Sequence, residues 1–230
     1  MRQPARVIHR FSTASSTQDE ARRLLEAGEA SLGHVVVADE QTAGRGRFGR
    51  LWASPSGGLY ATFLISSAPG IALFAGVAAA RALERLGVAV GLKWPNDIFV
   101  DGKKLAGILI EADRDLALVG VGINIDEPFV EGATSLWRIG VNVRRGELLL
   151  ALLDEINTPA DPGDVLAAYR ARSVTVGRRV KVLGRAGELV EGRAVDIDVE
   201  GQLVVETSAG TLHVSSGDCV HLEPTADAAQ

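Results

Sequence analysis

A hairpin signal in the middle of the chain limits the folds that it can adopt. The pair Asp101-Gly102 separates two runs with strand-like composition, residues 97–100 and residues 104–111. Asp-Gly suits a tight two-residue turn, so these runs are expected to form adjacent antiparallel strands. A doubly wound fold needs strands and helices that alternate along the chain, and this hairpin interrupts that alternation. The expected sheet is therefore mixed or mostly antiparallel.

Segments on both sides of the hairpin show helical or extended patterns. Thr17 and Glu20 have the spacing of a capping box, so a helix is expected to begin there and to end near Gly28. Further helices are expected at residues 71–86, 144–156 and 162–172, and further strands at residues 34–38, 59–65, 91–94 and 116–125. The 230 residues suffice for one medium domain with its own core and a small appendage.

The pattern changes after Ser173. From Val174 onward, apolar and polar residues alternate over short stretches that are separated by glycine-containing turns. Such a pattern is typical of several short antiparallel strands and indicates a small barrel. We therefore expect an α+β protein with a main domain at residues 1–173 and a small C-terminal domain at residues 174–230.

Composition restricts the classes of function. The net charge of −5 and the sequence pI near 5.4 argue against general nucleic-acid binding, which usually requires a basic balance. The single cysteine, Cys219, leaves no partner for an internal disulfide, which favours a cytoplasmic protein. No signal peptide and no bilayer-spanning apolar run is evident, and the four histidines are scattered, so neither a membrane location nor a histidine-rich metal site is expected.

The run Gly44-Arg45-Gly46-Arg47-Phe48-Gly49-Arg50, followed by Trp52, carries the strongest chemical signal. Glycines let backbone N–H groups approach an anion closely, and arginines add fixed charge and bidentate donors. A tryptophan offers a flat face to a purine or another apolar ring. This combination suits a reaction between a carboxylate and a triphosphate. Taken alone, a flexible basic turn explains the run equally well; the acidic chain around it and the absence of further repeats favour a specific pocket.

A second signal is Lys93-Trp94-Pro95-Asn96-Asp97, followed by Lys103 and Lys104. Pro95 ends a strand and exposes Asn96 and Asp97, whose oxygens suit Mg²⁺, a ribose or a phosphate. The turn at residues 101–102 would return a lysine towards Asp97, where it would neutralise charge that develops in adenylyl transfer. An ordinary surface hairpin is the alternative, and the spacing alone does not choose Lys104 over Lys103.

Two weaker signals complete the set. Residues 120–124, Gly-Val-Gly-Ile-Asn, indicate a strand whose glycines allow a close approach, although a buried strand with packing glycines explains them without a ligand. Ser16 and Thr17 are likewise explained by helix capping alone.

Together, four motifs in order resemble the biotin protein ligases. They are Ser16-Thr17-Gln18, then Gln41 with GRGRFGRLW, then KWPNDIFVDGKKLAGILIE, and finally VGVGINI. Each motif is modest by itself, but four in this order are specific, and the resemblance covers nearly the whole chain. It implies a class II aminoacyl-tRNA-synthetase-like mixed sheet with flanking helices, followed by an SH3-like C-terminal barrel.

The resemblance also implies an activity and its partners. The enzyme would activate biotin with ATP and Mg²⁺ as biotinyl-5′-AMP. It would then transfer biotin to a lysine of a biotin carboxyl carrier domain of a carboxylase. A homodimer is implied by some relatives. The motifs begin at Ser16, which leaves no room for the N-terminal helix-turn-helix of some relatives, so a ligase without DNA binding is expected.

Residue roles follow by position from the same resemblance. Lys104, Arg47 and Arg45 would stabilise charge during the reaction, Trp52 would stack on adenine, and Asp97 would be a Mg²⁺ ligand. The implied biotin site consists of Ser16, Thr17, Gln18, Gln41, Gly44, Arg45, Gly46, Arg47, Lys104 and Gly107. The implied ATP and adenylate site consists of Arg45, Arg47, Arg50, Trp52, Asn96, Asp97, Lys104 and Asn124. The family often has Asn where Gln18 stands, so the longer side-chain amide of Gln18 is expected to contact biotin differently from that Asn.

Two rival interpretations lead to different measurements. A lipoate ligase or octanoyl transferase shares the core fold, and competition between biotin and lipoate would separate it from a biotin ligase. A non-catalytic RNA- or protein-binding module would use the arginine run and the small barrel. It predicts salt-sensitive nucleic-acid binding without pyrophosphate release, and it leaves the hairpin lysines unexplained.

Overall fold

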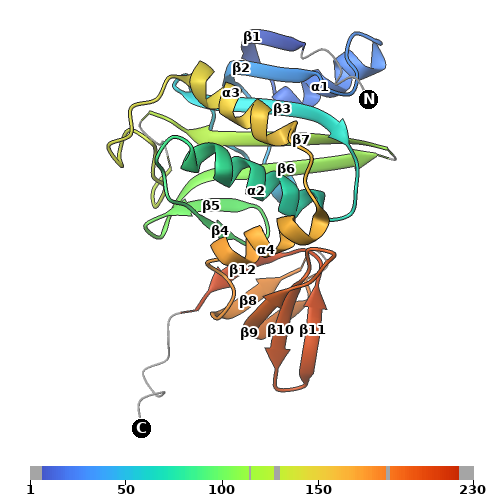
Figure 1. Cartoon of the computed structure of the whole chain (residues 1–230), viewed down its shortest axis with the longest axis vertical. Helices are drawn as coiled ribbons and strands as arrows, with labels where there is room; N and C mark the ends of the chain where they lie inside the picture. The colour runs from blue at the N-terminus through green and yellow to red at the C-terminus, as the bar shows by residue number, and fades with distance from the viewer. Residues whose placement is uncertain (1–6, 114, 127–129, 185–186, 223–230) are drawn as a thin grey trace.

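The computed structural model describes residues 7–113, 115–126, 130–184 and 187–222, which form two sheets and four α-helices (Figure 1). The last residues of the expected C-terminal domain, 223–230, lie outside the described part. The strands of the main sheet are β1 (Ile8–Ala14), β2 (Val35–Gln41), β3 (Gly58–Ser66), β4 (Gly91–Lys93), β5 (Asp97–Val100), β6 (Lys103–Asp113) and β7 (Leu116–Asn124). The α-helices are α1 (Thr17–Glu26), α2 (Ile71–Glu84), α3 (Arg145–Ile156) and α4 (Pro162–Arg172).

The main sheet is mixed, as expected, in the order β1-β2-β3-β7-β6-β5-β4. The pair β1/β2 is parallel, and the other neighbours in this sheet are antiparallel. Strand β1 was not expected from the sequence. Its residues IHRFSTA mix polar and apolar types, and only Ala14 is buried, so its local pattern is weak and its pairing with β2 decides its conformation.

The central hairpin is confirmed. Asp101 and Gly102 connect β5 to β6 with φ angles of 47° and 74°. Two successive positive φ angles match the twist of antiparallel strands, and Asp-Gly adopts them at low cost. The turn fixes the first pairs, Val100 with Lys103 and Phe99 with Lys104, and a β-bulge beyond them shifts the register so that Asp97 pairs with Gly107.

The first helix begins one residue earlier than the capping-box interpretation placed it. Ser16, not Thr17, is the N-cap, and its hydroxyl accepts the Gln18 N–H at 3.2 Å. Thr17 is the first helical residue, so its side chain is free for other contacts. The expected stops are confirmed at Gly28 and Gly87, which have φ angles of 69° and 83° just beyond the ends of α1 and α2.

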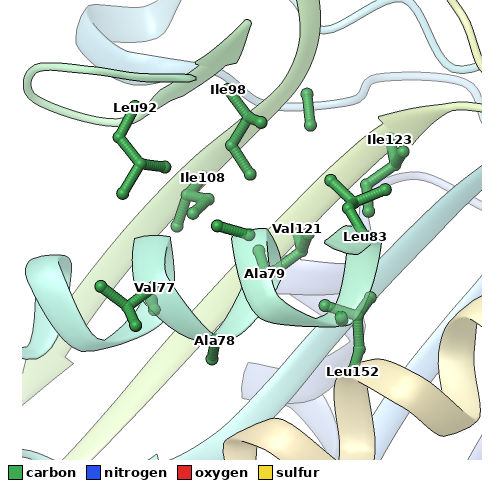
Figure 2. Close-up of a cluster of buried hydrophobic side chains, with 14 of the residues drawn as sticks. Val77, Ala78, Ala79, Leu83, Leu92, Ile98, Ile108, Val121, Ile123 and Leu152 are labelled. Carbon is green, nitrogen blue, oxygen red and sulfur yellow. The ribbon is translucent and has the colours of Figure 1, made fainter. Parts of the chain in front are cut away.

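Helices cover the two faces of the sheet unequally. On one face, α2 and α3 pack over the apolar side chains of β3, β6 and β7, and Figure 2 shows this layer around Val77, Ile108, Val121 and Leu152. On the other face, α1 covers only the region of Val36, Leu64 and Leu118. Beyond α1, Trp52 packs against the same face at Gly107 and Gly122.

The C-terminal strands form an antiparallel sheet in the order β11-β10-β9-β8-β12, and α4 lies between it and the main domain (Figure 1). Its strands are β8 (Arg179–Leu183), β9 (Leu189–Ile197), β10 (Leu203–Thr207), β11 (Gly210–Val214) and β12 (Asp218–His221). Trp94, which is 2% exposed, joins the two parts, because its indole N–H donates to Gly201 O and its backbone N–H donates to Thr175 Oγ1, both at 3.0 Å. Among the described residues, no helix combines the length and apolarity needed to cross a membrane.

Candidate active site

A cavity of about 500 Å³ lies on the less covered face of the main sheet, which is within the usual range for a small-molecule site. It is lined by most residues that the resemblance assigned to biotin and ATP: Ser16, Thr17, Gln18, Gln41, Arg45, Gly46, Arg47, Arg50, Trp52, Asn96, Asp97, Lys104, Gly107 and Asn124. Gly44 alone of the assigned set is not in the lining. Its Cα instead packs against the base of the loop, where a Cβ would lie 2.3 Å from Trp52 O and 2.5 Å from Ser54 Oγ.

Glycines of β6 and β7 make the floor of the cavity flat. The indole of Trp52 lies against this floor, and a Cβ on Gly122 would be 2.5 Å from its Nε1, while a Cβ on Gly107 would be 3.0 Å from its Cζ3. Further along β7, a Cβ on Gly120 would be 3.3 Å from the amide of Gln18. The strand glycines therefore allow close approach, as the sequence indicated: Gly107 and Gly122 make room for Trp52, and Gly120 makes room for Gln18.

One end of the cavity is buried and polar. Ser16, Thr17 and Gln18 are 1–4% exposed. Gln41 Oε1 accepts the Thr17 backbone N–H at 2.7 Å and the Thr17 hydroxyl at 3.2 Å. The Gln18 side-chain oxygen is buried and has no hydrogen-bond partner among the described residues. Since buried polar atoms are normally paired, this acceptor and its neighbours form a site for a polar group.

Two residues that the sequence did not single out complete this buried network. Thr62 Oγ1 donates to Thr17 Oγ1 at 2.9 Å, and Ser54 Oγ accepts from Gln41 Nε2 at 2.7 Å. The Ser54 hydroxyl in turn donates to Trp52 O at 2.9 Å. A threonine on a strand and a serine in a loop carry no local signal, because their partners lie elsewhere in the chain.

The structure shows which of the two hairpin lysines, Lys103 or Lys104, lies beside Asp97. Lys104 Nζ lies 2.6 Å from Asp97 Oδ1, whereas Lys103 is exposed to solvent. Lys104 also lies over the Trp52 ring, with Nζ 5.2 Å from the ring centroid. Lys104 therefore places a positive charge in the cavity, beside Asp97 and Trp52.

The three loop arginines differ in their surroundings. Arg47 lies between the start of β5 and the C-terminal sheet, where its Nη1 donates to Asn96 Oδ1 at 3.1 Å and to Gly217 O at 3.2 Å. Burial lowers the pKa of the Arg47 guanidinium, which stays charged at neutral pH because an arginine begins so high. Arg45 and Arg50 are instead paired with protein carboxylates, at 2.6 Å in each case.

The C-terminal sheet contributes one wall, which the sequence did not indicate. Residues 217–220 line the cavity, and Arg50 Nη2 lies 2.6 Å from Asp218 Oδ1. Cys219 belongs to this wall, and burial raises the pKa of its thiol to about 11. The thiol is therefore protonated at neutral pH and unsuited to nucleophilic attack.

The donor set near Asp97 suits a metal that arrives with phosphates. Mg²⁺ commonly takes one or two protein carboxylates and completes its shell with phosphate oxygens and water. Asp97 is the carboxylate at this position, and no group of three His, Cys, Asp or Glu side chains able to hold a metal occurs in the described part of the chain. An all-protein metal cage is thus absent there, while a shared site between Asp97 and a triphosphate fits.

Comparison with known proteins bears on what occupies this cavity. Residues 11–126 match the model of the biotin/lipoate A/B protein ligase family, and residues 175–222 match the biotin protein ligase C-terminal domain. The chain is 37% identical to the biotin–[acetyl-CoA-carboxylase] ligase of Mycobacterium tuberculosis, over 91% of this chain and 86% of the relative. The chain belongs to the biotin protein ligase family.

Two solved structures place this biotin ligase among its relatives in three dimensions. One is the biotin protein ligase of Aquifex aeolicus in complex with biotin and ATP, with a TM-score of 0.80 and 30% identity over 95% of this chain and 99% of that one. Another is the biotin protein ligase of Leishmania major in complex with biotinyl-5-AMP, with a TM-score of 0.65 and 29% identity over 91% and 99% of the two chains. The expected fold and enzyme class are thereby confirmed.

Proposed function

We propose that this biotin ligase activates biotin as biotinyl-5′-AMP and transfers it to one lysine of a biotin carboxyl carrier domain. The buried end of the cavity would hold the bicyclic ring of biotin. Lys104 and Arg47 would face the reacting carboxylate and phosphate, and Trp52 would face adenine. The observation that carries the proposal is the pattern of free donors and acceptors at the buried end.

That pattern is complementary to a urea group. Thr17 Oγ1 donates its hydrogen to Gln41 Oε1 and accepts one hydrogen from Thr62, so one lone pair remains for a ligand N–H. The Gln18 side-chain oxygen is a second free acceptor. Ser16 Oγ accepts the Gln18 N–H and keeps its own hydrogen for a ligand carbonyl. Two acceptors and one donor match the two N–H groups and the C=O of the ureido ring.

The same pattern disfavours lipoate. The dithiolane ring of lipoate has no N–H and no C=O, so it would leave the buried oxygens of Thr17 and Gln18 without partners. A site built to bond a polar group rejects an analogue that lacks it, because the buried polar atoms are then unpaired. The biotin-specific C-terminal domain match supports the same choice.

The middle of the cavity suits the first chemical step. The biotin carboxylate and the α-phosphate of ATP repel each other, and the two cations Lys104 and Arg47 are placed to screen both. In the proposed step, a carboxylate oxygen forms a bond to the α-phosphorus, and the bond to the pyrophosphate oxygen breaks. Mg²⁺ held by Asp97 and phosphate oxygens would neutralise charge on the triphosphate.

In the second step, transfer of biotin, a lysine of the carrier domain must reach the bound adenylate from outside the cavity. The lysine amine of the carrier domain would attack the carbonyl carbon of the mixed anhydride, and AMP would leave with the electron pair of the broken bond. The thiol of Cys219 stays protonated, so no covalent enzyme intermediate is proposed. The complex of the Leishmania major ligase with biotinyl-5-AMP supports the same intermediate for this chain.

The proposal includes a cytoplasmic location and a homodimer, as the family resemblance implies. A chain with a single cysteine fits a reducing compartment. Sedimentation of the purified protein with and without biotin and ATP tests the homodimer.

Biotin-dependent exchange of labelled pyrophosphate into ATP tests the first half of the proposal. We expect exchange with biotin and no competition by lipoate at equal concentration. Exchange that depends on lipoate instead would assign the chain to the sister activity. A folded protein that exchanges with neither, but binds nucleic acid in a salt-sensitive manner, would favour the non-catalytic binding module.

A further inference from the structure

Arg45 is held by carboxylates of two other elements. Its Nη1 lies 2.6 Å from Asp19 Oδ1 in the first turn of α1, and its Nη2 lies 2.6 Å from Glu111 Oε1 on β6. The second oxygen of Glu111 forms an ion pair with Arg22 of α1. Two carboxylates and two guanidiniums thus form a balanced network that connects α1, β6 and the arginine loop, residues 44–50.

This network acts at the base of the loop. The backbone of Arg45 is bridged to Leu51, and Gly46 N donates to Arg50 O at 2.7 Å, so residues 45–51 form a closed turn. Fixing the Arg45 side chain therefore fixes the direction in which the whole turn leaves the sheet. The backbone bridge between Arg45 and Leu51 closes the turn, and the ion pairs of Arg45 connect that turn to α1 and β6.

Arg45 and Arg47 consequently differ in what they can offer to a ligand. Both terminal nitrogens of Arg45 are committed to carboxylates of the protein. In the part of the chain that the structure describes, Arg47 donates hydrogen bonds to the neutral oxygens of Asn96 and Gly217, and the carboxylates of Asp218 and Asp97 act on it through space without a direct ion pair. A ligand anion gains more from a cation that is not already hydrogen-bonded to a carboxylate.

We propose that Glu111 and Asp19 are positioning residues that hold the arginine loop over the cavity through Arg45, whereas Arg47 is the loop arginine that meets the ligand anion. The ion-pair network is present in the protein without any ligand, so its role in holding the loop does not depend on the proposed function. Its consequence for the adenylate rests on the proposed function, because a loop held over the cavity slows escape of the bound intermediate and entry of water.

The expected effects are modest because the network is partly exposed. Side-chain exposure is 39% for Arg45, 45% for Asp19 and 23% for Glu111. Ion pairs with this exposure contribute little each and are weakened by salt. We expect Glu111→Gln to accelerate release of biotinyl-5′-AMP about three- to tenfold, and Asp19→Asn to do so by a smaller factor, with little change in the rate of adenylate formation.

The experiment measures two quantities on the full-length protein. The first is the release of preformed biotinyl-5′-AMP, followed by rapid filtration. The second is trypsin cleavage after the arginines of residues 45–50 in the ligand-free protein, which needs no activity. Glu111→Gln and Asp19→Asn keep all three loop arginines, so a faster cleavage reports a looser loop. The matched control is Glu20→Gln, which removes a charge from the same helix but breaks only the pair with Arg23.

A double-mutant cycle separates positioning from direct contact. If Arg45 acts through its two carboxylates, then Arg45→Gln, the double variant Asp19→Asn/Glu111→Gln and the triple variant that combines them should release the intermediate at similar rates. If Arg45 binds the ligand anion itself, Arg45→Gln should be far more damaging than the double variant, and the two effects should multiply. Raising the salt from about 0.05 M to about 0.5 M should bring the wild type towards the double variant Asp19→Asn/Glu111→Gln, which has lost both pairs with Arg45 and should itself change less.

Each outcome is informative. Faster cleavage and faster release in Glu111→Gln and Asp19→Asn, but not in Glu20→Gln, support the proposal. Wild-type cleavage and release in both variants overturn it. A wild-type protein that forms no adenylate refutes the proposed function instead, and the proteolysis result still decides whether the carboxylates hold the loop.

Discussion

Two glycines on one strand are expected to control the two ends of the cavity separately. Alanine at Gly122 would place a methyl carbon 2.5 Å from Nε1 and 2.6 Å from Cε2 of Trp52. Ordinary carbon contacts need about 3.5–4.0 Å, so the indole must move by roughly 1 Å. Stacking of a base on an aromatic side chain contributes about 1–3 kcal/mol. We therefore expect Gly122→Ala to raise the KM for ATP at least about tenfold, with a small effect on the KM for biotin.

Alanine at Gly120 should act on the other substrate. Its methyl carbon would lie 3.3 Å from Cδ and Oε1 of Gln18 and 3.4 Å from Leu109 O, which requires a shift of only a few tenths of an ångström. We expect a rise of about two- to fivefold in the KM for biotin, because a displaced buried acceptor weakens one hydrogen bond. The KM for ATP should stay near the wild-type value.

The assay is pyrophosphate exchange with each substrate varied in turn, together with thermal unfolding to confirm a folded protein. Gly146→Ala is the matched control, since Gly146 lies in α3 with open space around its Cα and should leave both KM values unchanged. Equal effects of Gly120→Ala and Gly122→Ala on both substrates would refute the assignment of separate ends to the cavity.

Three further predictions concern charge. Lys104→Gln should reduce pyrophosphate exchange by about 10²–10³-fold, because a cation aimed at the developing charge is lost, and near-normal exchange would remove Lys104 from the mechanism. Arg47→Gly should release biotinyl-5′-AMP into solution about tenfold faster, measured by mass spectrometry of the filtrate, and unchanged retention would contradict its position over the ligand. Burial, with Lys93 and Arg178 nearby, lowers the pKa of His221 to about 4 from an ordinary 6.5, so the folded protein binds this proton less readily than the unfolded chain. The contribution of His221 to the free energy of unfolding is therefore complete above about pH 6.5 and is lost as the pH falls towards 4. Because the side chain is only partly buried, we expect about 1–2 kcal/mol, which His221→Gln should remove from the difference in unfolding free energy between pH 7.5 and pH 5.

Features set by local chemistry were predictable from the sequence. The Asp101-Gly102 turn, the glycine stops of α1 and α2 and the start of α4 at Pro162 depend on residues next to each other in the chain. The hairpin also predicted that a lysine returns to Asp97. Whether Lys103 or Lys104 does so depends on which face of β6 is buried, and the structure shows that it is Lys104.

Features set by distant partners were not predictable. Strand β1 gains its conformation from β2, about 27 residues further along the chain, and its own residues favour no element strongly. The carboxylates that hold Arg45 and Arg50 are Asp19, Glu111 and Asp218, which have ordinary surface-residue patterns in the sequence. Only the folded arrangement separates these paired arginines from Arg47.

The most direct test of biotin transfer is the intact mass of a purified biotin carboxyl carrier domain after incubation with this protein, biotin, ATP and Mg²⁺. We predict an added mass of one biotinyl group, absent when lipoate replaces biotin and absent when the target lysine of the carrier is changed to arginine. A carrier that stays unmodified beside an active adenylate-forming enzyme would contradict the transfer step. A carrier modified by lipoate instead would contradict a buried site that recognises the urea group of biotin.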